Sequence, residues 1–329
     1  MALSTGALAL SDFENHRREL TGYCYRMLGS AFDADDAVQE TMVRAWKASD
    51  SFEGRSSVRT WLYRIATNVC TDLLRGRARR ALPMDLGPSC PPVLASLERV
   101  LGDEAWISPI ADARVADTGV DPAEQVAMRE SVRLAFIAAL QRLPARQRAS
   151  LILCEVLRWQ AAEVADLLGT SVAAVNSSLQ RARATLSALE SEGLSAAPSL
   201  APVEAEQREL LAAYVEAFES YDIERFVSLL HEDALQSMPP FAMWLRGLSD
   251  IGAWMDGPGH ECAGSWLVPT SANSCAAFGQ YRLNSDGVHR PWALQVVEIS
   301  GPKIARIHSF LDIERIFPAF GLPTELATR

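Results

Sequence analysis

The chain has 329 residues, more than one ordinary hydrophobic core accommodates, so two or three domains are expected. Its net charge is −10, but residues 1–80 carry 12 Lys and Arg against 10 Asp and Glu, whereas residues 204–329 carry 9 against 17. No apolar run reaches the length of a membrane span, and the six cysteines have no CxxC or His/Cys metal spacing. We therefore expect a cytoplasmic protein with no membrane partner, metal or cofactor.

Residues 10–80 contain two amphipathic helical stretches. In the first, "DADDAVQETMVRAW", apolar residues recur every three or four positions, which predicts a helix with one buried face. Acidic residues gather at its N-terminal end, where the helix dipole stabilises carboxylates. Composition alone is also consistent with a plain solvated face. The polar face carries Asp33, Asp35, Asp36, Gln39 and Glu40.

The second stretch, "VRTWLYRIATNVCTDLLRGRARR", follows the loop "SDSFEGRSS" and predicts a helix with two different faces. One face is apolar, whereas the other mixes aromatic, amide and cationic groups, a combination that stacks on unpaired bases and follows a phosphate backbone. For Trp61 a place in the core is an equally good interpretation. The candidate DNA-binding residues of the loop and this face are Phe52, Arg55, Trp61, Arg64, Asn68, Arg75 and Arg79.

The next segments differ in composition. Residues 81–121 form an acidic linker rich in Pro and Gly, with a short helix near 93–100. Residues 122–190 predict a four-helix module, whose first helix is capped by Asp121 and runs to about Leu143. Residues 191–203 predict a tether of small residues and prolines.

Within the four-helix module, "LRWQAAEVADLLGTSVAAVNSSLQRARATL" predicts a helix-turn-helix at about 160–180. Gly169 provides a turn with positive φ, and Thr170 and Ser171 can cap the second helix. Small and amide side chains face outward on that helix, which suits a major groove, and two arginines follow for phosphates. A helical hairpin without a partner is the alternative. The candidate DNA-binding residues are Ser171, Ala173, Ala174, Asn176, Ser177, Gln180, Arg181 and Arg183.

Residues 204–329 predict an α+β domain. Two helices separated by a turn at Tyr221–Asp222, and a third at "GLSDIGAWM", precede four strand-like stretches. Helices followed by an antiparallel meander favour a cone-shaped fold over a doubly wound sheet. Its aromatic residues are candidates for a ligand pocket, although aromatic residues in strands more often belong to a core. The candidate pocket residues are Tyr214, Phe218, Trp244, Trp266, Tyr281 and Trp292.

The two helical modules together resemble the extracytoplasmic-function sigma factors of bacterial RNA polymerase. "DADDAVQETMVRAW" is similar to the family's region 2.2, "FEGRSSVRTWLYRIATNVCTDLLR" to regions 2.3 and 2.4, and "LPARQRASLILCEVLRWQAAEVADLLGTSVAAVNSSLQRARATL" to region 4. The resemblance implies that the acidic helix binds the β′ clamp of core polymerase, that the second helix reads and melts the −10 element, and that the helix-turn-helix reads the −35 element. It also implies that the linker threads a basic channel of polymerase, although a disordered tether is equally consistent with it.

The last third resembles the SnoaL/NTF2-like fold, through "AYVEAFESYDIERFVSLLHEDA", "MPP" and "RGLSDIGAWM". The resemblance implies an intramolecular regulator, so that a separate anti-sigma factor is not required, and a small-molecule ligand is a candidate partner. Two alternatives stay open. One is a ligand-sensing helix-turn-helix regulator that works without polymerase core. The other is a cone-fold enzyme whose acid and base groups come from His231, Asp233, His308 and Asp312.

Overall fold

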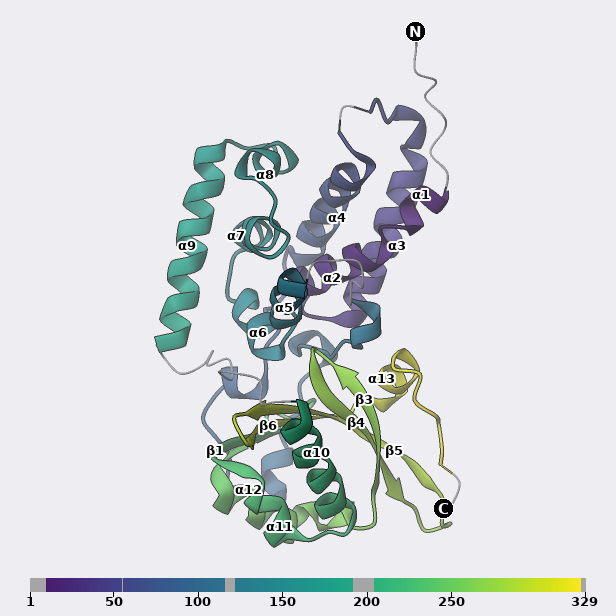
Figure 1. The fold of residues 1–329 in the computed structure, drawn as a ribbon, viewed down its shortest axis with the longest axis vertical. Coiled ribbons are helices and arrows are strands. Elements are labelled where there is room, and N and C mark those ends of the chain that lie inside the picture. The colour runs from purple at the N-terminus through teal and green to yellow at the C-terminus, as the bar shows by residue number, and fades with distance from the viewer. Residues whose placement is uncertain (1–9, 55, 116–121, 192–203, 327–329) are drawn as a thin grey trace. The chain divides into compact units, whose positions relative to one another are not determined.

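The computed structural model describes residues 10–54, 56–115, 122–191 and 204–326. The chain folds as two compact units, and neither is continuous in sequence: Met1–Arg80 joins Ala113–Ser195, and Ala81–Asp112 joins Ala196–Arg329. Figure 1 shows the helices of the first unit and the mixed sheet of the second. The predicted tether 191–203 lies almost entirely outside the described residues.

Residues 10–80, the N-terminal module, form a helical bundle. Ser30 accepts a hydrogen bond from the backbone N–H of Asp33, and Ser57 does the same for Thr60, so each of the two long helices begins with a side-chain cap. The apolar stripes predicted for both helices are buried, with Ala37 and Leu62 fully inaccessible. The helices are α1 (Leu10–Glu14), α2 (Arg17–Leu28), α3 (Ala31–Lys47) and α4 (Val58–Leu74).

Residues 122–191, the helix-turn-helix module, complete the first unit. Its helices are α5 (Pro122–Glu130), α6 (Leu134–Gln141), α7 (Ala145–Leu151), which continues as a π-helical turn over Ile152–Val156, α8 (Ala161–Leu167) and α9 (Val172–Ser191). The predicted turn is confirmed, because Gly169 has φ +59° and Ser171 accepts a hydrogen bond from the N–H of Ala174. The predicted single helix to Leu143 is wrong. It breaks at Ser131–Arg133, where Arg133 is extended and the Ser131 hydroxyl bonds to the preceding turn and to Arg26.

The second unit contains a six-stranded sheet in the order β2-β1-β6-β5-β4-β3. The predicted antiparallel meander is confirmed for β3 to β6, whereas β1 is not among the four predicted strand-like stretches. His231 therefore lies in a strand, and β1 pairs in parallel with β6. The strands are β1 (Leu230–Ser237), β2 (Trp244–Arg246), β3 (Trp266–Ala272), β4 (Cys275–Leu283), β5 (His289–Ser300) and β6 (Lys303–Phe310); the helices are α10 (Glu204–Glu219), α11 (Ile223–Ser228), α12 (Gly247–Asp256) and α13 (Ile313–Ala319).

Helices α10, α11 and α12 pack on one face of this sheet and form its main core. Tyr214 and Phe218 of α10 lie against Phe226 of α11 and Phe278 of β4, with ring centroids 5.7–6.1 Å apart. The opposite face is covered in part by the C-terminal end, since a Cβ at Gly279 would lie 2.8 Å from the Leu322 side chain. The predicted α+β class is confirmed, and the layer order places the aromatic residues of α10 inside the domain.

The linker segment 81–112 is an ordered part of this second unit, which the sequence did not indicate. Three main-chain hydrogen bonds join it to the β1–β2 connection and to β2: Cys90 N to Trp244 O at 2.8 Å, Leu101 N to Pro240 O at 3.1 Å, and Ala242 N to Arg99 O at 2.9 Å. At its other end, Ala111 bridges Ala272 at the end of β3. The segment therefore contacts both edge strands of the sheet.

The linker segment also closes on itself. Ala81 donates its N–H to Ala105 O at 2.8 Å and accepts from Ile107 N at 3.2 Å, so its first residue lies beside residues near its end. Asn273, which is fully buried, donates its N–H to Ile110 O and accepts the Ile110 N–H on its side chain. These contacts satisfy main-chain groups that a Pro-rich segment cannot pair within a helix.

Candidate nucleic-acid interface

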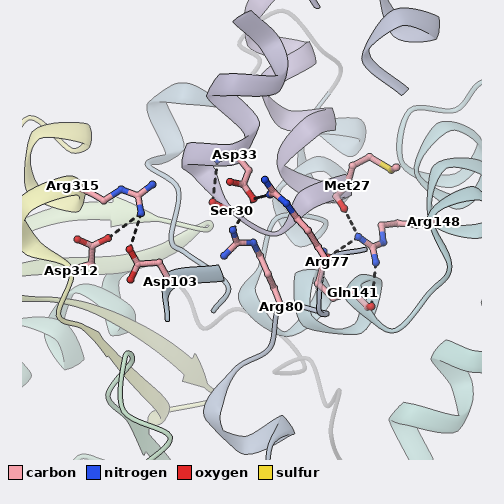
Figure 2. Close-up of polar contacts among 10 residues, drawn as sticks. All are labelled: Met27, Ser30, Asp33, Arg77, Arg80, Asp103, Gln141, Arg148, Asp312 and Arg315. Carbon is pink, nitrogen blue, oxygen red and sulfur yellow. Dashed lines mark hydrogen bonds and ion pairs between the residues drawn. The ribbon is translucent and has the colours of Figure 1, made fainter. Parts of the chain in front are cut away.

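The acidic face of α3 divides into internally paired and solvent-exposed residues. Figure 2 shows the Asp33 carboxylate between Arg77 and Arg80, at 3.0 and 2.7 Å. Asp35 is paired with Arg114. By contrast, Asp36, Gln39 and Glu40 are exposed, and among the described residues Glu40 pairs with Arg44 one turn along the helix. Of the five predicted residues, the last three are therefore available to a partner along one stripe of α3.

Two apolar residues that sequence reasoning missed extend this stripe. Val43 is 38% exposed and Trp46 is 61% exposed, although both belong to the same helix as the acidic residues. They follow Asp36, Gln39 and Glu40 at helical spacing, so they lie on the same side. An exposed tryptophan beside carboxylates is typical of a protein interface. The signal was present in "TMVRAW", where the two residues fall outside the apolar stripe of Ala37, Thr41 and Ala45.

The predicted −10 residues lie at the start of α4 and on its half-exposed face. Phe52 and Trp61 are in ring contact, with centroids 4.9 Å apart, and both are half-buried. Asn68 is exposed two helical turns after Trp61, on the same side of α4. Arg75 is exposed beside Asp72, and Arg79 is exposed, while Arg55 lies outside the described residues. Trp61, Asn68 and Arg75 recur every seven residues and thus follow one side of α4.

The helix-turn-helix module contacts α4 at Arg64 and, on the side opposite Trp61 and Asn68, at Arg59 and Tyr63. Arg64 donates a hydrogen bond to the Asp166 carboxylate of α8 at 2.9 Å. The Arg59 guanidinium lies 5.2 Å from the ring centroids of both Tyr63 and Trp159, and it pairs with Glu19 at 2.8 Å. The Tyr63 and Trp159 rings are themselves 5.0 Å apart. Burial raises the pKa of the Tyr63 hydroxyl well above its usual range.

Two buried arginines lie in the same contact between modules. Arg26 of α2 is 1% exposed and donates through Nε and Nη2 to the Ser131 hydroxyl at 3.0 and 2.7 Å. Arg148 of α7 donates to the Met27 carbonyl and to Gln141 (Figure 2). Desolvation lowers the pKa of each guanidinium to about 10. Neither has an ion pair with a carboxylate among the described residues.

The predicted reading surface of α9 is open to solvent. Ala173, Asn176 and Gln180 are exposed, whereas Ala174 and Ser177 are half-buried. Ser171 is exposed but uses its hydroxyl as the helix cap. The two arginines are exposed and weakly held, with Arg181 bonded to Ser177 and Arg183 to Glu155, each at 2.6 Å. Small side chains and two cations therefore follow one face of a long helix.

The candidate pocket residues of the C-terminal domain do not gather at one place. Tyr214 and Phe218 are core residues, and the Tyr214 hydroxyl donates to Gln295 at 2.6 Å. Trp266 stacks on His289 at 3.8 Å, Trp292 lies 4.0 Å from the Arg282 guanidinium, and Trp244 donates to Gly87 O of the linker segment. Tyr281 packs edge-on against Phe317.

The four candidate acid and base groups of an enzyme include one local pair, since the ring of His231 accepts the backbone N–H of Asp233 at 3.2 Å. His308 is 1% exposed, with Ser237 Oγ at 2.8 Å and Glu298 at 3.2 Å. Asp233 pairs with Arg246 in an exposed contact, and Asp312 lies at the start of α13 beside Arg315. Within the described part of the chain, no group of three or more His, Cys, Asp or Glu side chains is placed to hold a metal ion, and no helix is long and apolar enough to cross a membrane.

Comparison with known proteins matches family models to the N-terminal module and to the helix-turn-helix module. The Sigma-70 region 2 model matches residues 13–80, and the Sigma-70, region 4 model matches residues 133–186. A solved structure of the Mycobacterium tuberculosis extracytoplasmic function sigma factor SigJ superposes with a TM-score of 0.62 over 96% of this chain and all of that chain, at 22% identity. That likeness concerns the fold.

Sequence relatives carry the assignment further. The chain is 36% identical over 158 residues to the RNA polymerase sigma factor CnrH of Cupriavidus metallidurans, which covers 48% of this chain and 73% of CnrH. It is 47% identical over 317 residues to the ECF RNA polymerase sigma factor SigG of Mycobacterium tuberculosis, which covers 95% of this chain and 83% of SigG. The chain therefore belongs to the extracytoplasmic-function sigma factors, which bind core RNA polymerase and direct promoter-specific initiation of transcription.

Proposed function

We propose that the exposed stripe of α3 is the surface that binds the β′ clamp of core polymerase. Its contact residues are Asp36, Gln39 and Glu40, extended by Val43 and Trp46. Asp33 and Asp35 serve the fold of the module instead, because arginines of the same unit already pair with them. The observation that carries this proposal is an exposed tryptophan continuing an exposed acidic stripe.

The test is a pull-down with purified core polymerase. We expect Asp36→Arg/Glu40→Arg and Trp46→Ser to lose binding, since each removes contacts from the centre of the stripe. Asp286→Arg, at an exposed turn of the C-terminal domain, is the matched charge-reversal control and should bind as the native chain does. Full binding by both stripe variants would disprove the assignment.

The DNA-reading roles are proposed on the same basis. Phe52, Trp61 and Asn68 of the N-terminal module would hold unpaired bases of the −10 element, with Arg64, Arg75 and Arg79 along the backbone. Ala173, Asn176 and Gln180 of α9 would face the bases of the −35 element, and Arg181 and Arg183 the phosphates. A substitution in the N-terminal module should then change the base preference of transcription at the −10 element and leave the preference at the −35 element unchanged. A substitution in α9 should do the reverse.

We also propose that the C-terminal domain regulates the factor from within the chain by holding the linker segment 81–112. Fully extended, these residues would span about 110 Å. When Ala81 is bonded to residues 105–107, only the residues from 107 to 112 extend the segment further. Residues 81 and 112, the two ends of the linker segment, are then at most about 25 Å apart. The −10 and −35 elements are about 25 base pairs apart, or about 85 Å of B-DNA. A linker segment released from the C-terminal domain is therefore long enough to connect modules bound at the two elements. A linker segment held by that domain is too short to do so.

Transcription in a reconstituted system tests this role. The chain truncated after residue 203 has no sheet to hold the linker, so we expect higher promoter output per bound polymerase than with the full chain. Equal output from both forms would disprove regulation by capture.

Because the restraint is part of the chain, we propose that no separate anti-sigma factor is required, and that the factor acts in the cytoplasm with polymerase. We further propose that the domain acts without catalysis, and that a small molecule would act by changing linker capture.

A further inference from the structure

The captured linker segment contributes side chains, as well as main-chain groups, to the C-terminal domain. Cys90 and Leu97 are half-buried and pack against the core cluster that α10, α11, α12 and the sheet form. By contrast, Val93, Leu94 and Val100 of the same stretch are 45%, 67% and 55% exposed. The stretch therefore turns one apolar side into the domain and leaves the other in solvent.

The two inward side chains lie at the edge of the core beside β2. Three apolar residues of the domain are half-buried and pack against the same cluster: Met238 and Phe241 of the β1–β2 connection, and Leu248 in the first turn of α12. The main-chain bonds of the linker segment to this connection hold Cys90 and Leu97 against the cluster. Release of the linker segment therefore uncovers an apolar surface of the domain.

Gln236 places an unpaired hydrogen-bond acceptor in the same part of the domain. It lies on β1 opposite Leu245 of β2 and Ile307 of β6, which both belong to the core cluster, so its side chain is on the same face of the sheet. Gln236 is 7% exposed, and its Oε1 has no hydrogen-bond partner among the described residues. Because Leu245 directly follows Trp244, whose carbonyl accepts the Cys90 N–H, Gln236 and the linker segment flank the same short strand.

The other buried glutamines of this face are paired. Gln295 accepts from the Tyr214 hydroxyl and donates to Gln280, which in turn donates to Ser265. A buried amide oxygen without a donor costs stability, and a bound donor would recover that cost. The Gln236 carboxamide therefore stands ready for a donor that the described residues do not supply.

We propose that this edge of the C-terminal domain binds a small, mainly apolar molecule with one hydrogen-bond donor, and that Leu97 of the captured linker segment occupies part of the site. The apolar body of the ligand replaces Leu97 against Met238, Phe241 and Leu248, and its donor binds Gln236 Oε1. Ligand and linker segment then exclude each other, so the ligand releases the linker. The inference rests on the linker capture proposed above and gives that regulation a class of ligand.

Indole and 1-methylindole are suitable probes for the full-length protein, because both have an apolar double ring and only indole carries an N–H donor. Their dissociation constants are measured by ligand-observed NMR titration. We expect Leu97→Ala, which removes the competing side chain, to tighten indole binding about tenfold. Leu94→Ala, on the exposed side of the same stretch, is the matched control and should bind indole as the native chain does.

Gln236→Met tests the acceptor, because it replaces the carboxamide with an apolar side chain of similar length. The native chain should bind indole about tenfold more tightly than 1-methylindole, and this preference should disappear in Gln236→Met. A second readout follows the linker segment itself. Saturating indole should speed cleavage within 81–112 by a non-specific protease several-fold in the native chain, as expected for a ligand that displaces Leu97.

Equal indole affinity in the native chain and in Leu97→Ala would overturn the shared site, and so would an unchanged rate of linker cleavage at saturating indole. Equal affinity of the native chain for the two probes would overturn the role of Gln236. If indole binds and releases the linker segment as expected while promoter output stays constant, the site is supported and regulation by linker capture is rejected. The two proposals therefore fail in distinguishable ways.

Discussion

The two modules of the first unit meet through side chains, whereas the C-terminal domain holds the linker segment through paired main-chain groups as well as through side-chain contacts. In the first contact, Arg26 and Arg148 reach across and find hydroxyls, amides and carbonyls instead of carboxylates. In the second, Cys90, Arg99 and Leu101 use backbone N–H and C=O groups against the β1–β2 region. The first contact therefore depends on residue identity, whereas the main-chain part of the second tolerates sequence change provided that the backbone keeps its donors.

The largest expected effect comes from removing backbone donors of the linker segment. In Cys90→Pro/Leu101→Pro the acceptors Trp244 O and Pro240 O lose their partners, at about 1–3 kcal/mol each. We expect rapid proteolysis and hydrogen exchange within 81–112. Leu94→Pro is the matched control, because Leu94 is 67% exposed, begins a short helical turn and follows the extended Val93. Equal protection in both proteins would show that capture does not depend on the main chain.

Ser131→Ala tests whether the contact between the two modules of the first unit depends on side-chain identity. The single hydroxyl of Ser131 accepts two N–H groups of Arg26, so its loss leaves a buried guanidinium without these partners. We expect the contact to weaken by about 1–3 kcal/mol, seen as lower protection of α5 and α6 in hydrogen exchange. Cys90→Ala, which keeps every main-chain group of the linker, should leave the protection of 81–112 unchanged. A large loss there would contradict the comparison.

An intermediate effect is expected at Asp33, which pairs with two arginines beside the start of the linker segment. Asp33→Ala leaves Arg77 and the largely buried Arg80 without this carboxylate. We expect the unfolding free energy of the first unit to fall by about 1–3 kcal/mol, measured by denaturant titration, with polymerase binding retained. Asp36→Ala should show the reverse pattern. If Asp33→Ala abolished polymerase binding in the folded protein, Asp33 would belong to the docking surface.

The smallest effect concerns the side chains that accompany the captured linker. Arg315 pairs with Asp103 of the linker segment at 3.1 Å and with Asp312 at 3.7 Å (Figure 2). Burial, and then the charge of Asp103, raise the pKa of Asp312. Because the folded state binds the proton more tightly, the ionised carboxyl costs stability above its raised pKa, and this cost disappears as the pH falls below about 4. We expect Asp312→Asn to raise Tm slightly at pH 7 and not at pH 3.5. A lower Tm for Asp312→Asn than for the native chain at pH 7 would contradict this prediction.

Sequence reasoning predicted the elements whose signal is local. The cap Ser171, the positive φ of Gly169 and the apolar stripes of α3 and α4 each follow from neighbouring residues. Strand β1 was missed because "FVSLLHEDA" has helical spacing, and its strand form depends on pairing with β6, some 70 residues later. Propensity within a short window carries no information on such a partner.

The contacts between distant segments were missed for a related reason. A Pro-rich segment held by its main chain leaves no periodic side-chain pattern, so the linker segment looked like a tether. Arg26 is buried in α2, and no local pattern in the sequence marks it as a core residue. The exposure of Asp36 and Asn68 follows from the helical pattern, and both were predicted as candidate site residues. Arg64 was also predicted, but its pairing with Asp166 of the other module could not be read from the sequence.

The capture of an internal segment by a domain that follows it has a consequence during synthesis. Residues 81–112 leave the ribosome well before the strands that hold them, and Arg315, which binds Asp103, is made about 200 residues after the linker ends. At roughly 5–20 residues per second, this delay is about 10–40 s. In the later part of that interval, once residue 191 has been made, the nascent factor has both reading modules, an unrestrained linker and no completed sheet. Each new chain therefore passes through a brief unrestrained period before its own C-terminal domain is complete.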